Sequence, residues 1–363
     1  MALQFILGPS GAGKSEYIYE DIIRRTMQDE RENVIVLVPE QYSLEIQRKL
    51  VQKHPRGGSF QIDVIGFNRL AYRIFDELHI KPKKVLEDFG KSMLLRKAAQ
   101  EHKEELSLYA GSLDKAGFID EAKSLMSEIY QYDIPRERLR EALQKLDDSE
   151  EARVLARKLQ DMLVIFDAFE EKKGQSFIVA EQMLELLTAA AEQSELIAGS
   201  EIVLDGFTGF TPIQLNLISV LLRRAKKVTI VLTIDAATYE KKHVAEHELF
   251  ALTKQTIEHL LLTAEQAHVV VEPALFLGKD GCKRWSKGHP LAHLEQNLFR
   301  YPYRVGKDEE QAITITAYDT PAQELTGVAE QIRTLVMEQG YRYRDIAIVS
   351  GNLEETAEFA KLI

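Results

Sequence analysis

Residues 8–15, GPSGAGKS, have the residue types and the spacing of a phosphate-binding P-loop. Glycines let the backbone wrap closely around phosphates with its N–H groups pointing inward. In such a loop the lysine reaches the β- and γ-phosphates, and the serine hydroxyl holds Mg²⁺. The predicted ATP-binding residues are Gly8, Pro9, Ser10, Gly11, Ala12, Gly13, Lys14 and Ser15.

The flanking sequence provides the context that this chemistry needs. An apolar run at 3–7 predicts a strand before the loop, and a helical pattern opens at Lys14. A helix that begins there adds the positive end of its dipole to the phosphate site. The alternative, a glycine-rich turn with an incidental Lys-Ser pair, does not explain this strand, loop and helix order.

Hydrolysis needs a second acidic position, and Asp205 is the best candidate. It ends the apolar run 201–204, where it can support Mg²⁺ together with Ser15. Asp235, which ends another apolar run, is a weaker rival, and Asp205 as a simple strand-end turn residue remains an alternative. Many motor ATPases carry Glu directly after this Asp, whereas here Gly206 follows. We therefore predict nucleotide binding with weak or absent hydrolysis, and we assign no catalytic residue.

A second candidate surface lies on the helix predicted after the run 59–67. Arg69, Tyr72 and Arg73 share one face of that helix, and an aromatic ring beside arginines can stack bases and hold phosphates. A solvated helix face is the simpler interpretation from spacing alone. Phe207 and Phe210 lie near the presumed nucleotide site, and core packing is the simpler interpretation for them.

The elements that must position these residues follow a parallel α/β pattern. Strands are predicted at 3–7, 33–39, 59–67, 200–210 and 226–235, with helices between them. From 85 to 195 the periodicity is helical almost throughout. We therefore predict a nucleotide-binding domain formed by 1–84 and 196–305, and an inserted all-helical domain at 85–195.

The last part of the sequence predicts the start of a second α/β unit at 306–363. It combines a strand at 312–320, a helix, and a strand at 344–350, and it ends inside a helical pattern at 352–363. Because two strands and one helix do not complete a sheet, we expect a fragment of a longer polypeptide. The stretch 279–290 is predicted to be an exposed loop.

Composition sets limits on function. The 363 residues have a net charge of −11, so bulk charge does not support a simple nucleic-acid binder. Cys282 is the single cysteine, which excludes an internal disulfide and a cysteine-cluster metal site in this chain. No apolar run is long enough to span a bilayer, and a reducing, cytoplasmic setting fits.

Several stretches together resemble a known family. They are GPSGAGKS, VIVLVPEQYSLEIQRKL, IGFNRLAYRIF, IVLDGFTGFTPIQ and ELTGVAEQIRTLVMEQGYRYRDIAIVS. In this order they look like the N-terminal part of the AddB family. AddB is one half of the AddAB helicase–nuclease, which processes double-strand DNA ends.

The resemblance implies a superfamily-one helicase-like architecture. It comprises a RecA-like domain, an inserted helical domain and the start of a second RecA-like domain. It also implies a heterodimer with AddA, the partner helicase–nuclease chain, together with single-stranded DNA as a partner and recognition of a recombination hotspot sequence. The matching positions here are Gln41, Ser43, Phe67, Arg69, Tyr72 and Phe210. The family's nuclease and its 4Fe–4S cluster belong to a C-terminal part that this chain lacks.

Two other functions stay open from the residues alone. One is a stand-alone P-loop kinase or ATPase that acts on a small molecule, although it would not need the long helical insertion. The other is a structural partner whose P-loop is vestigial. Nucleotide binding separates the latter from the helicase-like function.

Overall fold

The computed structural model describes residues 1–29, 31–81, 83–147, 149–174, 176–278, 282–286, 288–307 and 312–351. The chain divides into two compact units, residues 1–287 and 288–363. The predicted nucleotide site and the predicted DNA surface both fall in the first unit. Of the described helices, none combines the length and the apolar character needed to cross a membrane.

A parallel α/β sheet organises the first unit, as the sequence predicts. The described strands run in the order β3-β2-β6-β7-β1-β8, and β9 also pairs with β1. Their bounds are Ala2–Gly8 (β1), Asn33–Leu37 (β2), Ile62–Ile65 (β3), Ser200–Leu204 (β6), Lys227–Thr233 (β7), Val270–Val271 (β8) and Leu275–Phe276 (β9). Every pairing is parallel, so the carboxyl ends of the strands share one edge. The P-loop and Asp205 both follow strands at this edge.

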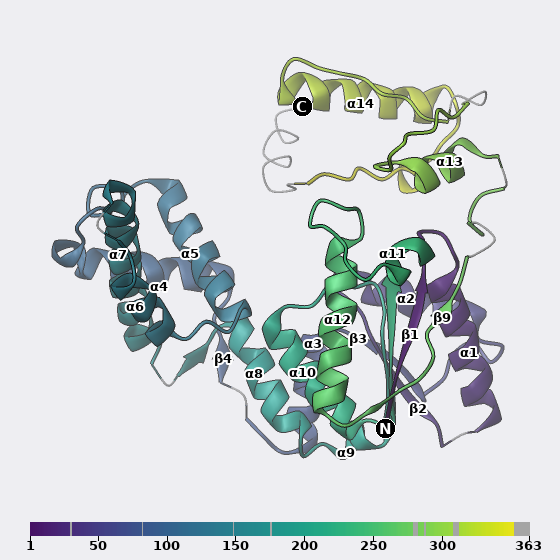
Figure 1. Ribbon diagram of the computed structural model, residues 1–363, viewed down its shortest axis with the longest axis horizontal. Helices are drawn as coiled ribbons and strands as arrows, with labels where there is room; N and C mark the ends of the chain where they lie inside the picture. Colours follow the sequence, from purple (N-terminus) through teal and green to yellow (C-terminus); the bar gives the residue numbers. More distant parts are fainter. Residues whose placement is uncertain are drawn as a thin grey trace. The chain divides into compact units, whose positions relative to one another are not determined.

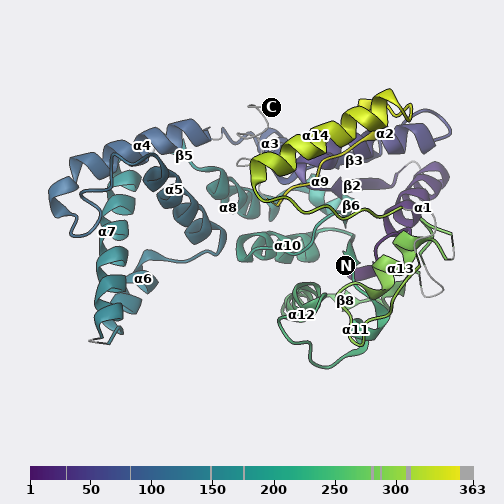
Figure 2. The same cartoon turned by 90° about the horizontal axis from the view of Figure 1, so that it is seen from above.

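Helices cover both faces of the sheet, which explains why its strands are apolar almost throughout. Each face of the sheet has its own hydrophobic core. Alternate residues of β1 point to opposite faces, so Leu3 and Leu7 pack in one core and Ile6 packs in the other. One face packs against α3 (Phe67–Glu77), α8 (Ala180–Ala191), α10 (Pro212–Arg224) and α12 (Ala251–Gln266). The other packs against α1 (Lys14–Gln28) and α2 (Ser43–Lys53), and Figures 1 and 2 show this layering.

Between β3 and β6 the chain forms a group of helices with its own core. They are α4 (Asp88–Glu101), α5 (Ala116–Gln131), α6 (Arg136–Gln144) and α7 (Glu150–Lys173), grouped together in Figure 1. Leu95, Met126 and Phe169 lie at the centre of this core. A two-stranded parallel pair, β4 (Lys84–Val85) and β5 (Phe177–Ile178), borders the helices. Helical periodicity alone did not reveal these two short strands.

A buried carboxylate fastens a loop to the longest helix of this group. Asp161 on α7 is only 1% exposed. Its oxygens accept hydrogen bonds from the backbone N–H groups of Ser107, Leu108 and Tyr109 at 2.8–2.9 Å, and from the Ser107 hydroxyl at 3.1 Å. Burial alone would raise the pKa of the Asp161 carboxyl, but these hydrogen bonds outweigh burial and lower it.

The second unit contains helices α13 (Pro290–Asn297) and α14 (Pro321–Met337). The strands predicted at 312–320 and 344–350 are wrong: the described residues form no strand there, and Tyr343–Asp345 is a 3-10 turn. Ile315 and Val349 are each 93% exposed, so their apolar side chains have no sheet to pack into. An apolar run becomes a strand only where another strand pairs with it. The helical pattern predicted at 352–363 lies outside the described residues.

The remaining elements are short: η1 (Glu40–Tyr42), η2 (Lys103–Glu105), α9 (Glu195–Ala198) and α11 (Ala236–Glu240). The segment 279–290, predicted to be an exposed loop, is only partly one. Cys282 and Trp285 are half-buried against the P-loop, and Pro290 already begins α13.

Candidate functional site

The predicted P-loop, residues 8–15, connects β1 directly to α1 at the carboxyl edge of the sheet. Gly11 and Gly13 have φ angles of +71° and +83°, a left-handed conformation that glycine adopts without strain. The Lys14 ammonium donates hydrogen bonds to the carbonyl oxygens of Gly8 and Pro9, both at 2.9 Å. The loop therefore curls around the lysine, and a cation lies within the concave backbone.

Asp205 is tied to the same helix that follows the P-loop. The strand β7 lies between β1 and β6, which separates the P-loop strand from the Asp205 strand by about 10 Å. Tyr19 of α1 bridges this gap, because its hydroxyl donates a 2.6 Å hydrogen bond to Oδ2 of Asp205. Tyr19 lies one helical turn after Ser15, so the serine and the tyrosine share a helix face. Burial, and then the Asp205 charge, raise the pKa of the Tyr19 hydroxyl, which stays a donor.

Gly206 cannot readily be replaced by the glutamate of a motor ATPase. Its φ is +83°, and a Cβ atom placed there would lie 3.3 Å from Cδ of Pro39. A larger residue would be strained in backbone conformation and crowded by the proline. The backbone after Asp205 is therefore built for glycine, which explains in physical terms the Gly206 noted in the sequence.

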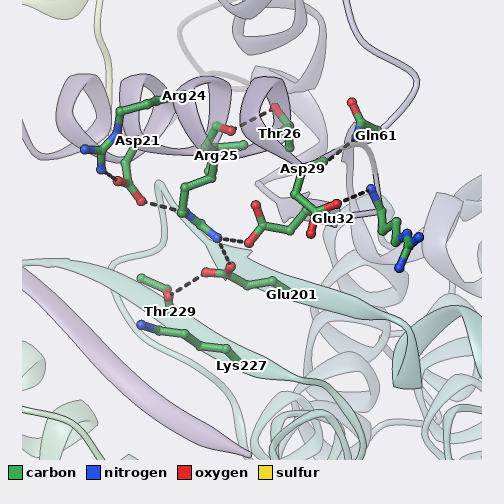
Figure 3. Close-up of polar contacts among 12 residues, drawn as sticks. Asp21, Arg24, Arg25, Thr26, Asp29, Glu32, Gln61, Glu201, Lys227 and Thr229 are labelled. Carbon is green, nitrogen blue, oxygen red and sulfur yellow. Dashed lines mark hydrogen bonds and ion pairs between the residues drawn. The ribbon is translucent and has the colours of Figure 1, made fainter.

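A second polar tie joins α1 to β6 at the far end of the strand. The Arg25 guanidinium binds Glu201 at 2.6 Å, Glu32 at 2.5 Å and Asp21 at 2.9 Å, as Figure 3 shows. Glu201 also accepts a 3.3 Å hydrogen bond from Thr229 of β7. Burial opposes the charge of Arg25, but its bond to Glu201 and the other carboxylates raise the pKa of Arg25. Hydrogen bonds and ion pairs thus hold α1 against both ends of β6, through Asp205 and Glu201.

Asp235, the weaker rival of Asp205, has a structural partner. Its Oδ1 accepts a 2.6 Å hydrogen bond from the backbone N–H of Thr238 and so caps α11. Asp205 has no such local role, and within the described residues Tyr19 is the one hydrogen-bond donor to its carboxylate. Of the two, Asp205 is therefore better suited to hold an external ligand.

The residues at this edge fit a magnesium–nucleotide pair. The cradle is lined by glycine backbone, Lys14 offers a cation, and Ser15 and Asp205 offer oxygen atoms. Mg²⁺ prefers oxygen ligands and needs only one or two from the protein when phosphates supply others. Elsewhere, no group of three His, Cys, Asp or Glu side chains in the described part could hold a metal.

The predicted DNA-binding residues lie near one another along α3 and the loop after β6. Arg69 and Tyr72 are exposed on α3, whereas Phe67 is half-buried at its start. The Phe67 and Phe207 rings have centroids 5.4 Å apart, and Phe207 and Phe210 are 5.3 Å apart. These three rings pack onto the sheet core and still expose part of their surface.

Gln41 and Ser43 follow Glu40, which contacts the start of α3. The sequence did not reveal this contact. The Glu40 carboxylate accepts a 3.0 Å hydrogen bond from the Asn68 N–H and so caps α3 from outside the helix. A Cβ at Gly66 would lie 2.2 Å from that carboxyl group, so only glycine admits the cap. Ser43 donates to the Glu40 carbonyl at 2.9 Å, and Gln41 is exposed.

Arg69 and Tyr72 line an open cleft of about 500 Å³ together with Gln47, Asp63 and Asp76. Arg73, which shares their helix face, forms an ion pair with Asp63. The cleft therefore presents acidic as well as basic groups. Any affinity for nucleic acid here would come from Arg69 and the Tyr72 ring rather than from a uniformly positive surface.

Comparison with known proteins gives a consistent result. A family described as "ADDB, N-terminal" matches residues 5–295. A relative from Lachnoclostridium phytofermentans is 38% identical and covers 99% of this chain. Relatives from Clostridium novyi and Clostridioides difficile are 30% and 32% identical, over 100% and 97% of the chain. Each is named as the B subunit of an ATP-dependent helicase/deoxyribonuclease, and the chain spans about a third of their length, 30–31%.

Proposed function

The chain belongs to the family of AddB N-terminal regions, and we propose that it is the nucleotide-holding, DNA-engaging part of a helicase–nuclease. In this proposal the whole protein is the AddB chain of an ATP-dependent helicase/deoxyribonuclease. It works with AddA as a heterodimer in the repair of double-strand DNA breaks in the cytoplasm. The nuclease, with its 4Fe–4S cluster, belongs to other parts of the full-length protein.

The observation that carries this proposal is the link from the P-loop helix to Asp205 through Tyr19. It supports a single Mg²⁺–ATP site in which Lys14 holds the phosphates. Ser15 and Asp205 hold the metal, which neutralises phosphate charge when it is bound. Because Gly206 supplies no carboxylate to orient a water, this site holds ATP with little or no turnover.

The architecture proposed for this role is that of a superfamily-one helicase. Residues 1–84 and 196–305 form a RecA-like domain, residues 85–195 form a helical insertion, and residues 306–363 begin a second RecA-like domain. The separate core of α4–α7 supports treating this part of the insertion as a folding unit of its own, whereas α8 packs against the sheet. A compact small-molecule kinase would not need such an insertion.

The proposed DNA surface consists of Gln41, Ser43, Phe67, Arg69, Tyr72 and Phe210. Its role is to engage single-stranded DNA and to read a recombination hotspot sequence. Tyr72 would stack a base, Arg69 would pair with a phosphate, and the edges of Phe67 and Phe210 would border the strand. The Glu40 cap would hold these side chains in position through the start of α3.

Measuring ATP affinity and ATP turnover on the purified chain tests the nucleotide part. We expect Mg²⁺-dependent binding, turnover near background, and affinity at least about tenfold weaker in Lys14→Ala, because a charge-assisted contact is lost. Lys158→Ala, an exposed lysine on α7, is the matched control and should bind like the wild type. Fast turnover, or no binding by the wild-type chain, would refute this part.

Single-stranded DNA binding by the complex assembled with its partner chain tests the DNA part. Arg69→Ala and Tyr72→Ala should each weaken binding by about 1–3 kcal/mol. Arg157→Ala and Tyr132→Ala, exposed positions in the helical group, are the matched controls. Unchanged binding and an unchanged hotspot response in both α3 variants would show that this surface is wrongly assigned.

A further inference from the structure

A segment far along the chain packs against the outer side of the P-loop. It consists of residues 275–278 and 282–286, called here the brace. Leu275–Phe276 forms β9 alongside β1, with Phe276 opposite Leu7, and the N–H of Leu277 donates to the carbonyl of Leu7 at 2.8 Å. The chain thus reaches the P-loop as a continuation of the sheet.

Residues 282–284 of the brace donate hydrogen bonds to two carbonyl oxygens of the P-loop. The carbonyl oxygen of Gly11 accepts the N–H groups of Lys283 and Arg284, at 3.0 Å and 3.2 Å. The Cys282 thiol lies 3.5 Å from the carbonyl oxygen of Ser10 and donates to it. In a trans peptide the carbonyl and the next N–H point in opposite directions. Binding the Ser10 carbonyl from outside therefore turns the Gly11 N–H toward the inside of the loop.

The side chains of the brace lie close to the loop at Gly11 and Gly13. A Cβ placed on Gly11 would lie 2.3 Å from the sulfur of Cys282 and 3.1 Å from Cβ of Arg284. A Cβ on Gly13 would lie 3.3 Å from Cδ of Lys283. The aliphatic stem of Lys283 therefore runs past the residue that precedes Lys14, and the Lys283 side chain is exposed.

The side chain of Arg284 takes a different direction from that of its neighbour Lys283. Its guanidinium carbon lies 5.7 Å from the centre of the Trp285 ring, in a cation–π contact. Trp285 in turn approaches the loop, since its ring is 3.6 Å from the Cβ position of Gly11. Lys283 thus extends along the P-loop, whereas Arg284 is held over an aromatic ring.

We infer that Lys283 is a second phosphate-binding cation of the nucleotide site, and that the brace fixes the loop in its phosphate-binding shape. This inference rests on the proposed nucleotide binding. The ligand is the polyphosphate of a nucleotide, which Lys14 meets from inside the loop and Lys283 from the brace. A segment that the sequence predicts as an exposed loop becomes a wall of the site.

The chain carries its own reporters for a test, because Trp285 and Cys282 are its single tryptophan and single cysteine. ATP with Mg²⁺ should change the Trp285 emission and slow alkylation of the Cys282 thiol. Lys283→Ala should weaken ATP affinity about tenfold, the loss of one charge-assisted contact, and Lys283→Arg should restore most of it. Arg284→Ala should change affinity less than about twofold, since it keeps the backbone N–H that holds Gly11.

Equilibrium dialysis with labelled ATP, run on the same variants, separates the two proposals. If the wild-type chain binds ATP and Lys283→Ala binds equally well, the role of Lys283 is wrong while the proposed function stands. Equal losses in Lys283→Ala and Arg284→Ala would also overturn it, because they would indicate general charge rather than a contact. If the wild-type chain binds no ATP, the proposed function fails and this inference fails with it. Circular dichroism confirms that each variant is folded.

Discussion

Two buried aspartates show how differently the helical group and the sheet edge use the same side chain. Asp161 is 1% exposed and Asp205 is 5% exposed, so both residues are buried away from solvent. Asp161 accepts three backbone N–H groups and one hydroxyl, which fill most of its acceptor sites. Asp205 accepts a single hydrogen bond from the described residues, that of Tyr19.

The difference indicates what each region is for. A carboxylate whose lone pairs are mostly used by the protein stabilises the fold and has little left for a ligand. A buried carboxylate with one donor keeps oxygen lone pairs for a cation, and burial without such a partner is costly. Asp161 is therefore satisfied within the helical group, whereas Asp205 keeps acceptor sites for the cation that we propose at the carboxyl edge of the sheet.

The strongest way to break this contrast is to remove the Asp161 carboxylate. Asp161→Ala should lower the free energy of unfolding by about 3 kcal/mol, because three N–H groups lose their acceptor. Nucleotide affinity should not change. Asp167→Ala on the same helix, an exposed carboxylate paired with Arg136 and Arg140, should cost less than about 1 kcal/mol. Chemical denaturation measures both, and equal losses would contradict the special role of Asp161.

The next effect concerns the tie at the far end of β6. Arg25→Ala should destabilise the chain by about 2 kcal/mol, because it leaves Glu201 buried without its cation. ATP affinity should stay within about twofold, since the tie is remote from the P-loop. Arg24→Ala is the control, because the Arg24 side chain is 67% exposed and pairs only with Asp21 among the described residues. If both arginine variants unfold alike, the network in Figure 3 adds little.

A smaller change tests the link between the P-loop helix and Asp205. Tyr19→Phe removes one hydroxyl and should cost about 1 kcal/mol of stability. It should also weaken ATP binding severalfold in the presence of Mg²⁺ but not in its absence, because only the metal depends on how Asp205 is held. Tyr17→Phe, a half-exposed tyrosine on the same helix, should do neither. A loss that is equal with and without Mg²⁺ would contradict the link.

Acid provides the mildest test, since it neutralises Asp161 without removing it. The pKa of Asp161 is lower in the folded chain than in the unfolded chain. Its stabilising contribution is therefore complete above the unfolded value, about 3.9, and is lost as the pH falls through the folded value. The stability difference between the wild type and Asp161→Asn should be constant above about pH 5 and shrink below about pH 4. A difference that does not change with pH would show that the charge is irrelevant.

The sequence predicts the parallel sheet, the P-loop context and the helical group because these depend on local patterns. Continuous apolar runs such as 33–39 mark strands covered on both faces, and glycine spacing marks the loop. Contacts between distant segments left no local pattern. Tyr19 to Asp205 spans 186 positions, the Glu40 cap joins η1 to the start of α3, and the brace joins Gly11 to Lys283. The strands predicted in the second unit failed for the same reason, since pairing depends on partners that a local pattern does not show.

ATP binding by the wild-type chain and by Asp205→Asn, each measured with and without Mg²⁺, tests most directly whether Asp205 supports the metal. Asparagine keeps an oxygen for the Tyr19 hydroxyl but removes the charge that a cation needs. If Asp205 supports the metal, Mg²⁺ tightens ATP binding in the wild type and has little effect in Asp205→Asn, while both bind alike without the metal. An equal response to Mg²⁺ in the two proteins would contradict the claim that Asp205 is the metal-supporting carboxylate of this site.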